Sequence, residues 1–147
     1  MERNRIHSVA HAVFGVLYLV QIVNAVINFK LSIIGLISIL FGLLLIVLAC
    51  KERRKFEFTA CGIYAIVRHP EFLGHMLIIF GMMISRTILS ILVCAILIAM
   101  LYLGILSEEK ENLKKFGKNY EEYMKRVPRL NILEGVRRKC KYKEQTL

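Results

Sequence analysis

The chain has 147 residues, 56% of them hydrophobic, and a mean hydropathy of +0.55. This length predicts a single domain over residues 1–147, and the apolar fraction excludes an ordinary water-soluble domain, in which about 45–50% is usual. The formal net charge is +10, and the basic residues cluster at the ends of apolar runs, as in the cytoplasmic loops of membrane proteins. No base-reading element accompanies this charge, which argues against nucleic-acid binding.

Two apolar segments come first, at residues 9–29 and 31–50. Each is long enough to cross a hydrocarbon layer of about 30 Å as a helix, and their short separation predicts a tight helical hairpin. Polar residues recur at helical spacing within the first segment, at Gln21, Asn24 and Asn28. We expect them to form hydrogen bonds between helices, with a role in ligand binding as the alternative.

A polar connection follows at residues 51–69, and its basic start predicts a cytoplasmic position. The third apolar segment, residues 71–85, begins after Pro70, a favourable residue for the first turn of a helix. It is short for a full crossing, whereas the fourth segment, residues 88–106, is long enough to span. The predicted fold is an all-α membrane bundle of about four segments in two hairpins, with both termini on the cytoplasmic side.

After Ser107 the chain becomes charged. Apolar residues recur there at spacings of 3 and 4, which predicts an amphipathic cytoplasmic helix whose apolar side faces protein or lipid. This stripe consists of Leu113, Phe116, Tyr120, Tyr123 and Val127. Gly117 interrupts the pattern, and Lys114, Lys115 and Lys118 should face water. The tail beyond Pro128 is strongly basic, so we expect it to be mobile and attracted to anionic lipid.

Two clusters of ionisable residues stand where apolar segments meet polar regions. Arg68, His69 and Glu71 lie at the start of the third segment, and Glu108 and Glu109 directly follow the fourth. Charged groups so close to a span are costly unless they are paired or functional. A hairpin of these segments would bring the two clusters together around an interfacial cavity suited to a zwitterionic or cationic cofactor. In the alternative interpretation, the arginine only anchors the cytoplasmic side and the glutamates solvate a helix end.

The histidines and cysteines predict no metal site. His7 and His11 could share one helix face, and Cys61, His69 and His75 could be imagined around zinc. A lone histidine pair of this kind is more often interfacial than a metal site, and the second set matches no usual zinc-ligand spacing. The sequence also contains no glycine-rich nucleotide-binding motif, so no soluble nucleotide-binding fold is expected.

The residues around the two clusters resemble the isoprenylcysteine carboxyl methyltransferase family and the related phospholipid methyltransferases. The resemblance covers about residues 60–130. Its first motif, G-x-Y-x-x-x-R-H-P-x-Y-x-G, matches Gly62, Tyr64, Arg68, His69, Pro70 and Gly74. Its second motif, a Glu pair followed by F-G-x-x-Y-x-x-Y and V-P-R, matches Glu108, Glu109, Phe116, Gly117, Tyr120, Tyr123, Val127, Pro128 and Arg129. Phe72 and Ser107 depart from the family pattern, and this leaves the methyl acceptor open.

The resemblance implies a membrane methyltransferase that uses S-adenosylmethionine and a lipid-like acceptor, such as an isoprenylcysteine carboxylate, at the membrane–cytosol interface. The residues that it assigns to the cofactor pocket are Tyr64, His69, Gly74 and Glu108. Arg68 and Glu109 are the candidate catalytic residues. Arg68 would hold an acceptor carboxylate, or Glu109 would act as base toward an acceptor amine.

Three other functions are alternatives to this prediction. One is N-methylation of a phospholipid amine, and the second is a non-catalytic membrane scaffold that retains the fold. The third is a transporter or channel subunit, which predicts charged groups in the middle of the spans. The centres of the second and fourth apolar segments carry no charged residue, which argues against transport.

Overall fold

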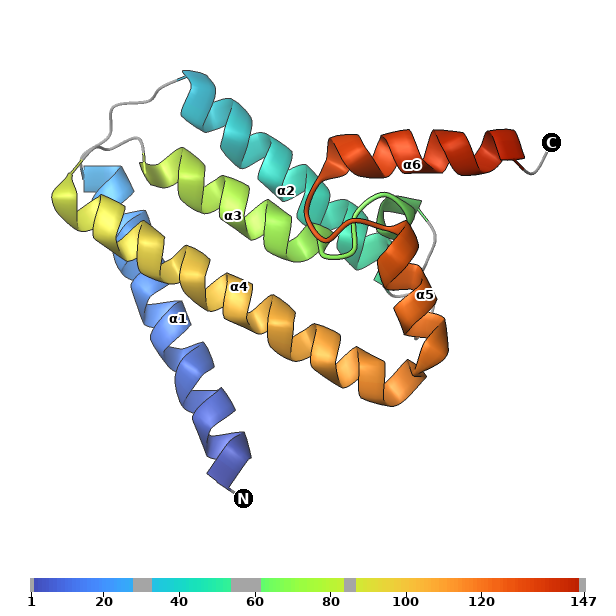
Figure 1. The fold of residues 1–147 in the computed structure, drawn as a ribbon. Helices are drawn as coiled ribbons and strands as arrows, with labels where there is room; N and C mark the ends of the chain where they lie inside the picture. Colours follow the sequence, from blue (N-terminus) through green and yellow to red (C-terminus); the bar gives the residue numbers. More distant parts are fainter. Residues whose placement is uncertain (1, 28–32, 54–61, 84–86, 146–147) are drawn as a thin grey trace.

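The computed structural model describes residues 2–27, 33–53, 62–83 and 87–145. Within these ranges the chain is all-helical, as predicted (Figure 1). The elements are α1 (Glu2–Ile27), α2 (Ile33–Arg53), the short 3-10 turn η1 (Gly62–Ala65), α3 (Pro70–Met82), α4 (Ile88–Phe116), α5 (Lys118–Arg126) and α6 (Ile132–Gln145). The four predicted apolar segments correspond to α1, α2, α3 and α4. The predicted hairpin of the first two was wrong, because α1 packs against α4 and α3, whereas α2 packs against α3. Asn28 and Cys61 lie outside the described residues.

Among the described residues, two helices are long and apolar enough to cross a membrane, namely α2 over Ile33–Glu52 and α4 over Ile88–Phe116. Shorter apolar helices cover Ala12–Ile27 of α1 and Pro70–Met82, which is α3. Only 22% of the apolar window of α2 is buried inside the molecule, and Leu, Ile and Val side chains are exposed along α1, α2 and α4. A helix in the core of a water-soluble protein would bury this surface, so these helices are suited to lipid.

Glycines bring α2 and α3 into close contact. A Cβ atom on Gly74 would lie 2.7 Å from the carbonyl oxygen of Gly42, and a Cβ atom on Gly81 would lie 2.7 Å from that of Gly35. The two glycines of each helix are seven residues apart, so they lie on one side of it after two turns. Small residues allow helix backbones to approach in this way without side chains between them. The pairing holds α3 against α2 along its length.

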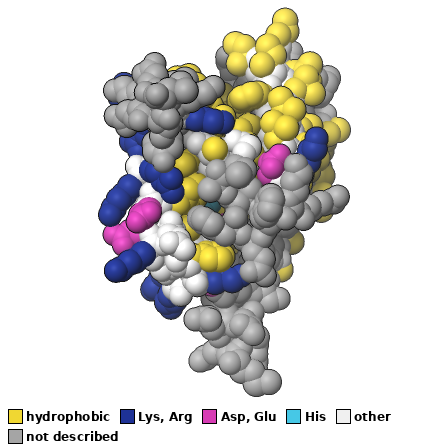
Figure 2. Space-filling view, turned by 90° about the vertical axis from the view of Figure 1, so that its right-hand side faces the viewer, with side chains coloured by type: hydrophobic (Ala, Val, Ile, Leu, Met, Phe, Trp, Pro, Cys, Tyr) yellow, Lys and Arg dark blue, Asp and Glu magenta, His cyan; other side chains and the backbone are white. Residues whose placement is uncertain are grey.

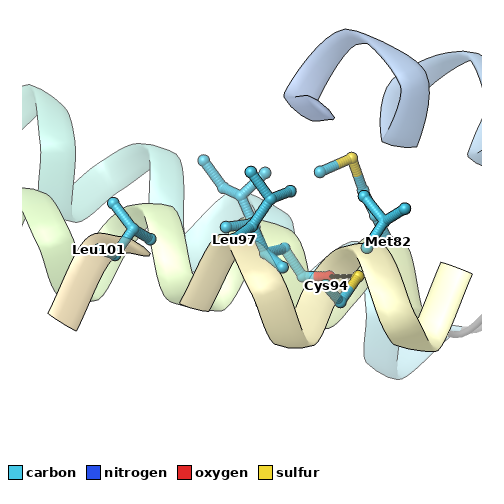
Figure 3. Close-up of a cluster of buried hydrophobic side chains, with 7 residues drawn as sticks. Met82, Cys94, Leu97 and Leu101 are labelled. Atoms are coloured by element: carbon cyan, nitrogen blue, oxygen red, sulfur yellow. Dashed lines mark hydrogen bonds between the residues drawn. The ribbon is translucent and has the colours of Figure 1, made fainter. Parts of the chain in front are cut away.

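The main hydrophobic core lies between α3 and α4 (Figure 3). Its buried residues are Ile78, Ile79, Met82, Val93, Cys94, Leu97 and Leu101. Figure 3 also shows the Cys94 thiol, which donates to the carbonyl oxygen of Ile79 over 3.6 Å. The side chains of α1 that pack against this core include Phe14, Leu17 and Tyr18.

Polar side chains attach α1 to the start of α4. Gln21 is fully buried, and its Nε2 atom donates to the hydroxyl oxygen of Ser90 over 2.6 Å. Asn24 Nδ2 donates to the hydroxyl oxygen of Thr87 over 3.2 Å. The predicted hydrogen bonds between helices are therefore confirmed for Gln21 and Asn24.

The predicted amphipathic stripe is confirmed over most of its length. Tyr120 and Tyr123 are each 3% exposed and form a cluster with Val127, against which Phe116 packs. The three lysines expected on the other side are exposed, at positions 114, 115 and 118. Leu113 is exposed as well, so the stripe that packs against protein begins one turn later than the spacing predicts.

The stripe is divided between two helices rather than one. α4 continues without a break from its apolar part to Phe116 and ends at Gly117, where φ is 54° and ψ is −129°. Glycine adopts positive φ at little cost, so the chain turns there into α5 (Figure 1). The C-terminal end of α2, the start of α3 and the charged end of α4 lie at the same end of the bundle (Figure 1).

The basic tail is helical from Ile132 to Gln145, which its charge did not predict, and its mobility stays a prediction. At the start of α6, Asn131 Oδ1 accepts from the backbone N–H of Glu134 over 3.0 Å, which caps the helix. Gly135 is buried, and it lacks the Cβ atom that would collide with the carbonyl oxygen of Ile66. These contacts depend on the tertiary structure, and the charge of the tail does not reveal them.

Candidate active site

The two sequence motifs are joined through their backbones. The N–H of Arg68 donates to the carbonyl oxygen of Pro128 over 3.0 Å, and the N–H of His69 donates to that of Arg129 over 3.3 Å. Pro70 begins α3, so these bonds fix the residues directly before that helix. The Arg-His-Pro turn and the Val-Pro-Arg segment therefore form one unit at the end of the bundle.

Glu109 occupies the centre of this unit. It projects from the charged end of α4, is 4% exposed and contacts three basic side chains. Its Oε1 atom lies 2.9 Å from Nη1 of Arg68 and 3.2 Å from Nε2 of His69. Arg129 binds the carboxylate with two bonds, from Nη2 to Oε2 over 2.7 Å and from Nε to Oε1 over 3.1 Å. Paired bonds of this kind are both strong and specific in orientation.

His69 is neutral in this environment. Burial lowers its pKa to about 4, and the charges of Arg68 and Arg129 act in the same direction, while Glu109 opposes them. A neutral imidazole beside a carboxylate donates its proton to it, so the Nε2 atom is the donor toward Glu109. The Nδ1 atom is then an acceptor, and it lies 3.9 Å from Oε2 of Glu108.

Glu109 remains ionised. Burial alone would raise its pKa, but the hydrogen bonds from Arg129 and the charges of Arg68 and Arg129 outweigh it and hold the pKa below its ordinary value. A carboxylate of lowered pKa is a weak base at neutral pH. The paired bonds from Arg129 and the lowered pKa therefore favour a positioning role for Glu109 over the role of base that an amine acceptor would need.

Arg68 has bonding capacity left over. Its side chain is only 9% exposed, and its Nε atom is buried without a hydrogen-bond partner among the described residues. Its Nη1 atom is close to Glu109 but lacks the alignment of a hydrogen bond. Leaving a buried donor unsatisfied is costly, and a guanidinium readily binds a carboxylate or phosphate oxygen. This side chain is the best candidate to bind an anionic group of a ligand.

The predicted cofactor residues differ in how they relate to this cluster. His69 and Glu108 belong to it, and the Glu108 side chain is 35% exposed. Tyr64 lies nearby in η1, where its hydroxyl donates to Glu71 Oε1 over 3.3 Å and its carbonyl oxygen accepts from the Tyr123 hydroxyl over 2.7 Å. Gly74 instead contacts α2, and this packing explains a glycine there without a cofactor. Its assignment to the cofactor pocket stays a prediction.

Sequence analysis assigned Arg129 no role beyond its place in a motif, yet this residue makes the shortest hydrogen bond to Glu109. Its Nη1 atom also donates to the hydroxyl of Tyr102 over 3.0 Å, and its guanidinium lies 5.8 Å from the centre of that ring. Tyr102 precedes Glu109 by seven residues, which is two helical turns, so both side chains lie on one side of α4. This spacing places Tyr102 beside Glu109 but does not bring Arg129 to them, so the sequence carried no signal for the arrangement.

Comparison with known proteins supports the motif resemblance. The family model described as phospholipid methyltransferase matches residues 13–119, which include the Arg-His-Pro turn and the Glu pair. Protein-S-isoprenylcysteine O-methyltransferase of Schizosaccharomyces pombe is 31% identical over 84 residues, which cover 56% of this chain and 36% of that protein. The match thus spans about a third of the length of this curated relative.

No solved structure matches the chain. The family match extends over most of the chain, from α1 into the start of α5, and the apolar helices within it are those expected of an integral membrane protein. The chain therefore belongs to the phospholipid methyltransferase family.

Proposed function

We propose that this chain transfers a methyl group from S-adenosylmethionine to a lipid-like acceptor that carries a carboxylate, such as an isoprenylcysteine. The observation that carries the proposal is the buried guanidinium of Arg68, whose Nε atom has no partner among the described residues. A carboxylate matches the fork of a guanidinium in charge and in geometry. The relative from Schizosaccharomyces pombe, named for O-methylation of isoprenylcysteine, favours the same chemistry.

The charges at the site favour a carboxylate over an amine acceptor. A carboxylate is already ionised at neutral pH and can attack without losing a proton. An ammonium group must first lose a proton to a base, and the lowered pKa of Glu109 makes it a poor base. In the proposed site Glu109 orients Arg68 and Arg129, and Arg68 aligns the acceptor with the methyl group. Correct alignment of two reactants can lower a reaction barrier by several kcal/mol, and by about 7–11 kcal/mol at most.

The described residues fit a bound S-adenosylmethionine, which would supply a methyl group on a positively charged sulfur. His69 is neutral and so adds no positive charge beside a sulfonium, while its Nδ1 atom can accept a hydrogen bond. The partly exposed carboxylate of Glu108 can accept from an ammonium group or from ribose hydroxyls. By the family resemblance, Tyr64 and Gly74 complete the pocket.

The proposed site lies at the membrane–cytosol interface, because the donor dissolves in water and the acceptor in lipid. In this topology α1 to α4 are the four membrane segments, while residues 51–69 and the region after residue 106 are cytoplasmic with both termini. The distribution of Lys and Arg supports this orientation. Single cysteines introduced at 51–55 test it, because reagents outside intact cells should not label them.

Titration of the purified protein in detergent with S-adenosylhomocysteine tests the cofactor site. Glu108→Gln and His69→Ala should each weaken binding while leaving the protein folded. The loss of one charge-assisted hydrogen bond corresponds to about tenfold to a hundredfold in affinity. Arg68→Ala should retain cofactor affinity and lose turnover, because the arginine serves the acceptor. Glu111→Gln is the matched control, since this glutamate is exposed on the same helix.

Two results would contradict the assignment. If Glu108→Gln and His69→Ala both bind S-adenosylhomocysteine as tightly as the unchanged protein, the cofactor binds elsewhere. No binding by the unchanged, folded protein would favour the alternative of a non-catalytic membrane scaffold. Thermal unfolding of each variant is the control that separates lost binding from lost structure.

A further inference from the structure

α6 presents apolar side chains away from the rest of the protein. Leu133 is 84% exposed and Val136 is 44% exposed. At about 100° per residue these two positions lie on the same side of the helix, and Gly135 lies on the opposite side. Gly135 is the position buried against Ile66. Over the first half of α6 the outward side is therefore apolar, whereas water would favour polar residues there.

Basic residues border this apolar side. Arg137 lies about 40° beyond Leu133 around the helix, and Lys139 lies about 60° beyond Val136 on the other side. Both are exposed, and the Arg137 side chain is 69% exposed. The helix as a whole contains five Lys and Arg residues against two Glu. An apolar stripe between long basic side chains is typical of helices at a bilayer surface, where Lys and Arg reach the phosphates.

The place of α6 in the fold is consistent with contact to a membrane. It begins at the end of the bundle where α2 ends and α3 begins (Figure 1), and Gly135 attaches it to the turn that leads into Arg68. Figure 2, which views the molecule toward this end, shows Lys and Arg side chains beside a large hydrophobic surface. The lipid that surrounds the apolar helices therefore lies close to the first turns of α6.

We propose that the outward side of α6 binds the anionic lipid surface of the membrane that surrounds the bundle. Leu133 and Val136 would enter the headgroup region, and Arg137 and Lys139 would pair with lipid phosphates. A second copy of the chain fits less well, because a symmetric pair of α6 helices would bring these basic residues together. Lipid bound here would also support the turn that carries Arg68, through the contact between Gly135 and Ile66.

The absence of tryptophan from the sequence allows a direct test on the full-length protein. Leu133→Trp introduces a single tryptophan at the centre of the proposed contact, which can be excited selectively over the six tyrosines. The protein is reconstituted into vesicles of phosphatidylcholine alone or with phosphatidylglycerol, each containing brominated lipid as a quencher. Asn119→Trp, at an exposed position of α5, is the matched control.

We expect brominated lipid to quench Leu133→Trp strongly in the anionic vesicles and weakly in the zwitterionic ones, and to leave Asn119→Trp unaffected. Added salt should reduce the quenching, because it screens the charges. Adding Arg137→Gln or Lys139→Gln should weaken docking by about fivefold for each basic residue removed. These readouts do not involve methyl transfer, so they stand or fall independently of the proposed function.

Three outcomes would overturn the proposal. Leu133→Trp with water-like emission and no quenching would show that α6 stays in solvent. Blue-shifted emission without quenching would show that protein, such as a second copy, covers the helix. Equal quenching in both kinds of vesicle would show that anionic lipid is not the partner.

Discussion

Glu109→Gln tests the architecture of the site, because it keeps the shape of the side chain and removes the charge that faces Arg68, His69 and Arg129. Removing one partner of a buried ion pair destabilises a protein by about 3–5 kcal/mol. The Arg129 side chain is 33% exposed and can regain water, whereas that of Arg68 is 9% exposed and cannot. One arginine thus stays buried without a counter-charge. We therefore expect a loss of stability near the lower end of this range, about 3 kcal/mol.

Thermal unfolding of the purified protein, followed by circular dichroism, measures this loss. For a chain of about this size, 3 kcal/mol corresponds to a decrease in Tm of roughly 6–12 °C. Glu111→Gln provides the control, since an exposed substitution on the same helix should change the stability by no more than about 0.5 kcal/mol. A double-mutant cycle of Glu109→Gln with Arg129→Gln should give a coupling energy of about 1–3 kcal/mol.

Equal Tm values for Glu109→Gln and Glu111→Gln would refute this reasoning. They would mean that the buried carboxylate does not stabilise the unit formed by the two motifs. A coupling energy near zero in the cycle with Arg129→Gln would contradict the paired hydrogen bonds in the same way.

Thermal unfolding also tests three further predictions. As the pH falls from 6.5 to 4, the protein should lose up to about 3 kcal/mol of stability, because His69 has a lower pKa when folded, about 4, than when unfolded; His69→Gln should lack this part of the loss. Gly74→Ala should cost about 1–3 kcal/mol, because its Cβ atom would meet the carbonyl oxygen of Gly42, whereas Gly15→Ala has open space and should not destabilise. Gly117→Ala should cost about 1 kcal/mol or more through its positive φ alone, since nothing lies near its Cβ position. An unchanged Tm in Gly74→Ala or Gly117→Ala, or a stability independent of pH over this range, would contradict the corresponding argument.

The lengths of the apolar runs were enough to predict the four helices α1 to α4, because a helix in lipid must satisfy its backbone internally and keep an apolar surface. The spacing of Gln21 and Asn24 was enough to predict their hydrogen bonds to another helix. The motifs also identified Arg68, His69, Glu108 and Glu109, which the structure brings together through the pairing of α3 with α4.

The sequence could not predict features that depend on contacts between distant segments. The helical tail depends on Gly135 meeting Ile66, and the bonds of Arg129 to Glu109 depend on the backbone pairing of Arg68 with Pro128. A glycine in a motif can serve a helix contact or a ligand, and the sequence does not distinguish these. Only the structure reveals that Gly74 contacts Gly42.

The most direct test of the central claim is the chemical nature of the methylated product. The protein is reconstituted in vesicles with methyl-labelled S-adenosylmethionine and either a prenylated cysteine or phosphatidylethanolamine. We predict label on the prenylated cysteine as a methyl ester, which alkali releases as methanol, and no such product from Arg68→Ala. Alkali-stable label on phosphatidylethanolamine, with none on the prenylated cysteine, would contradict the carboxylate assignment of Arg68.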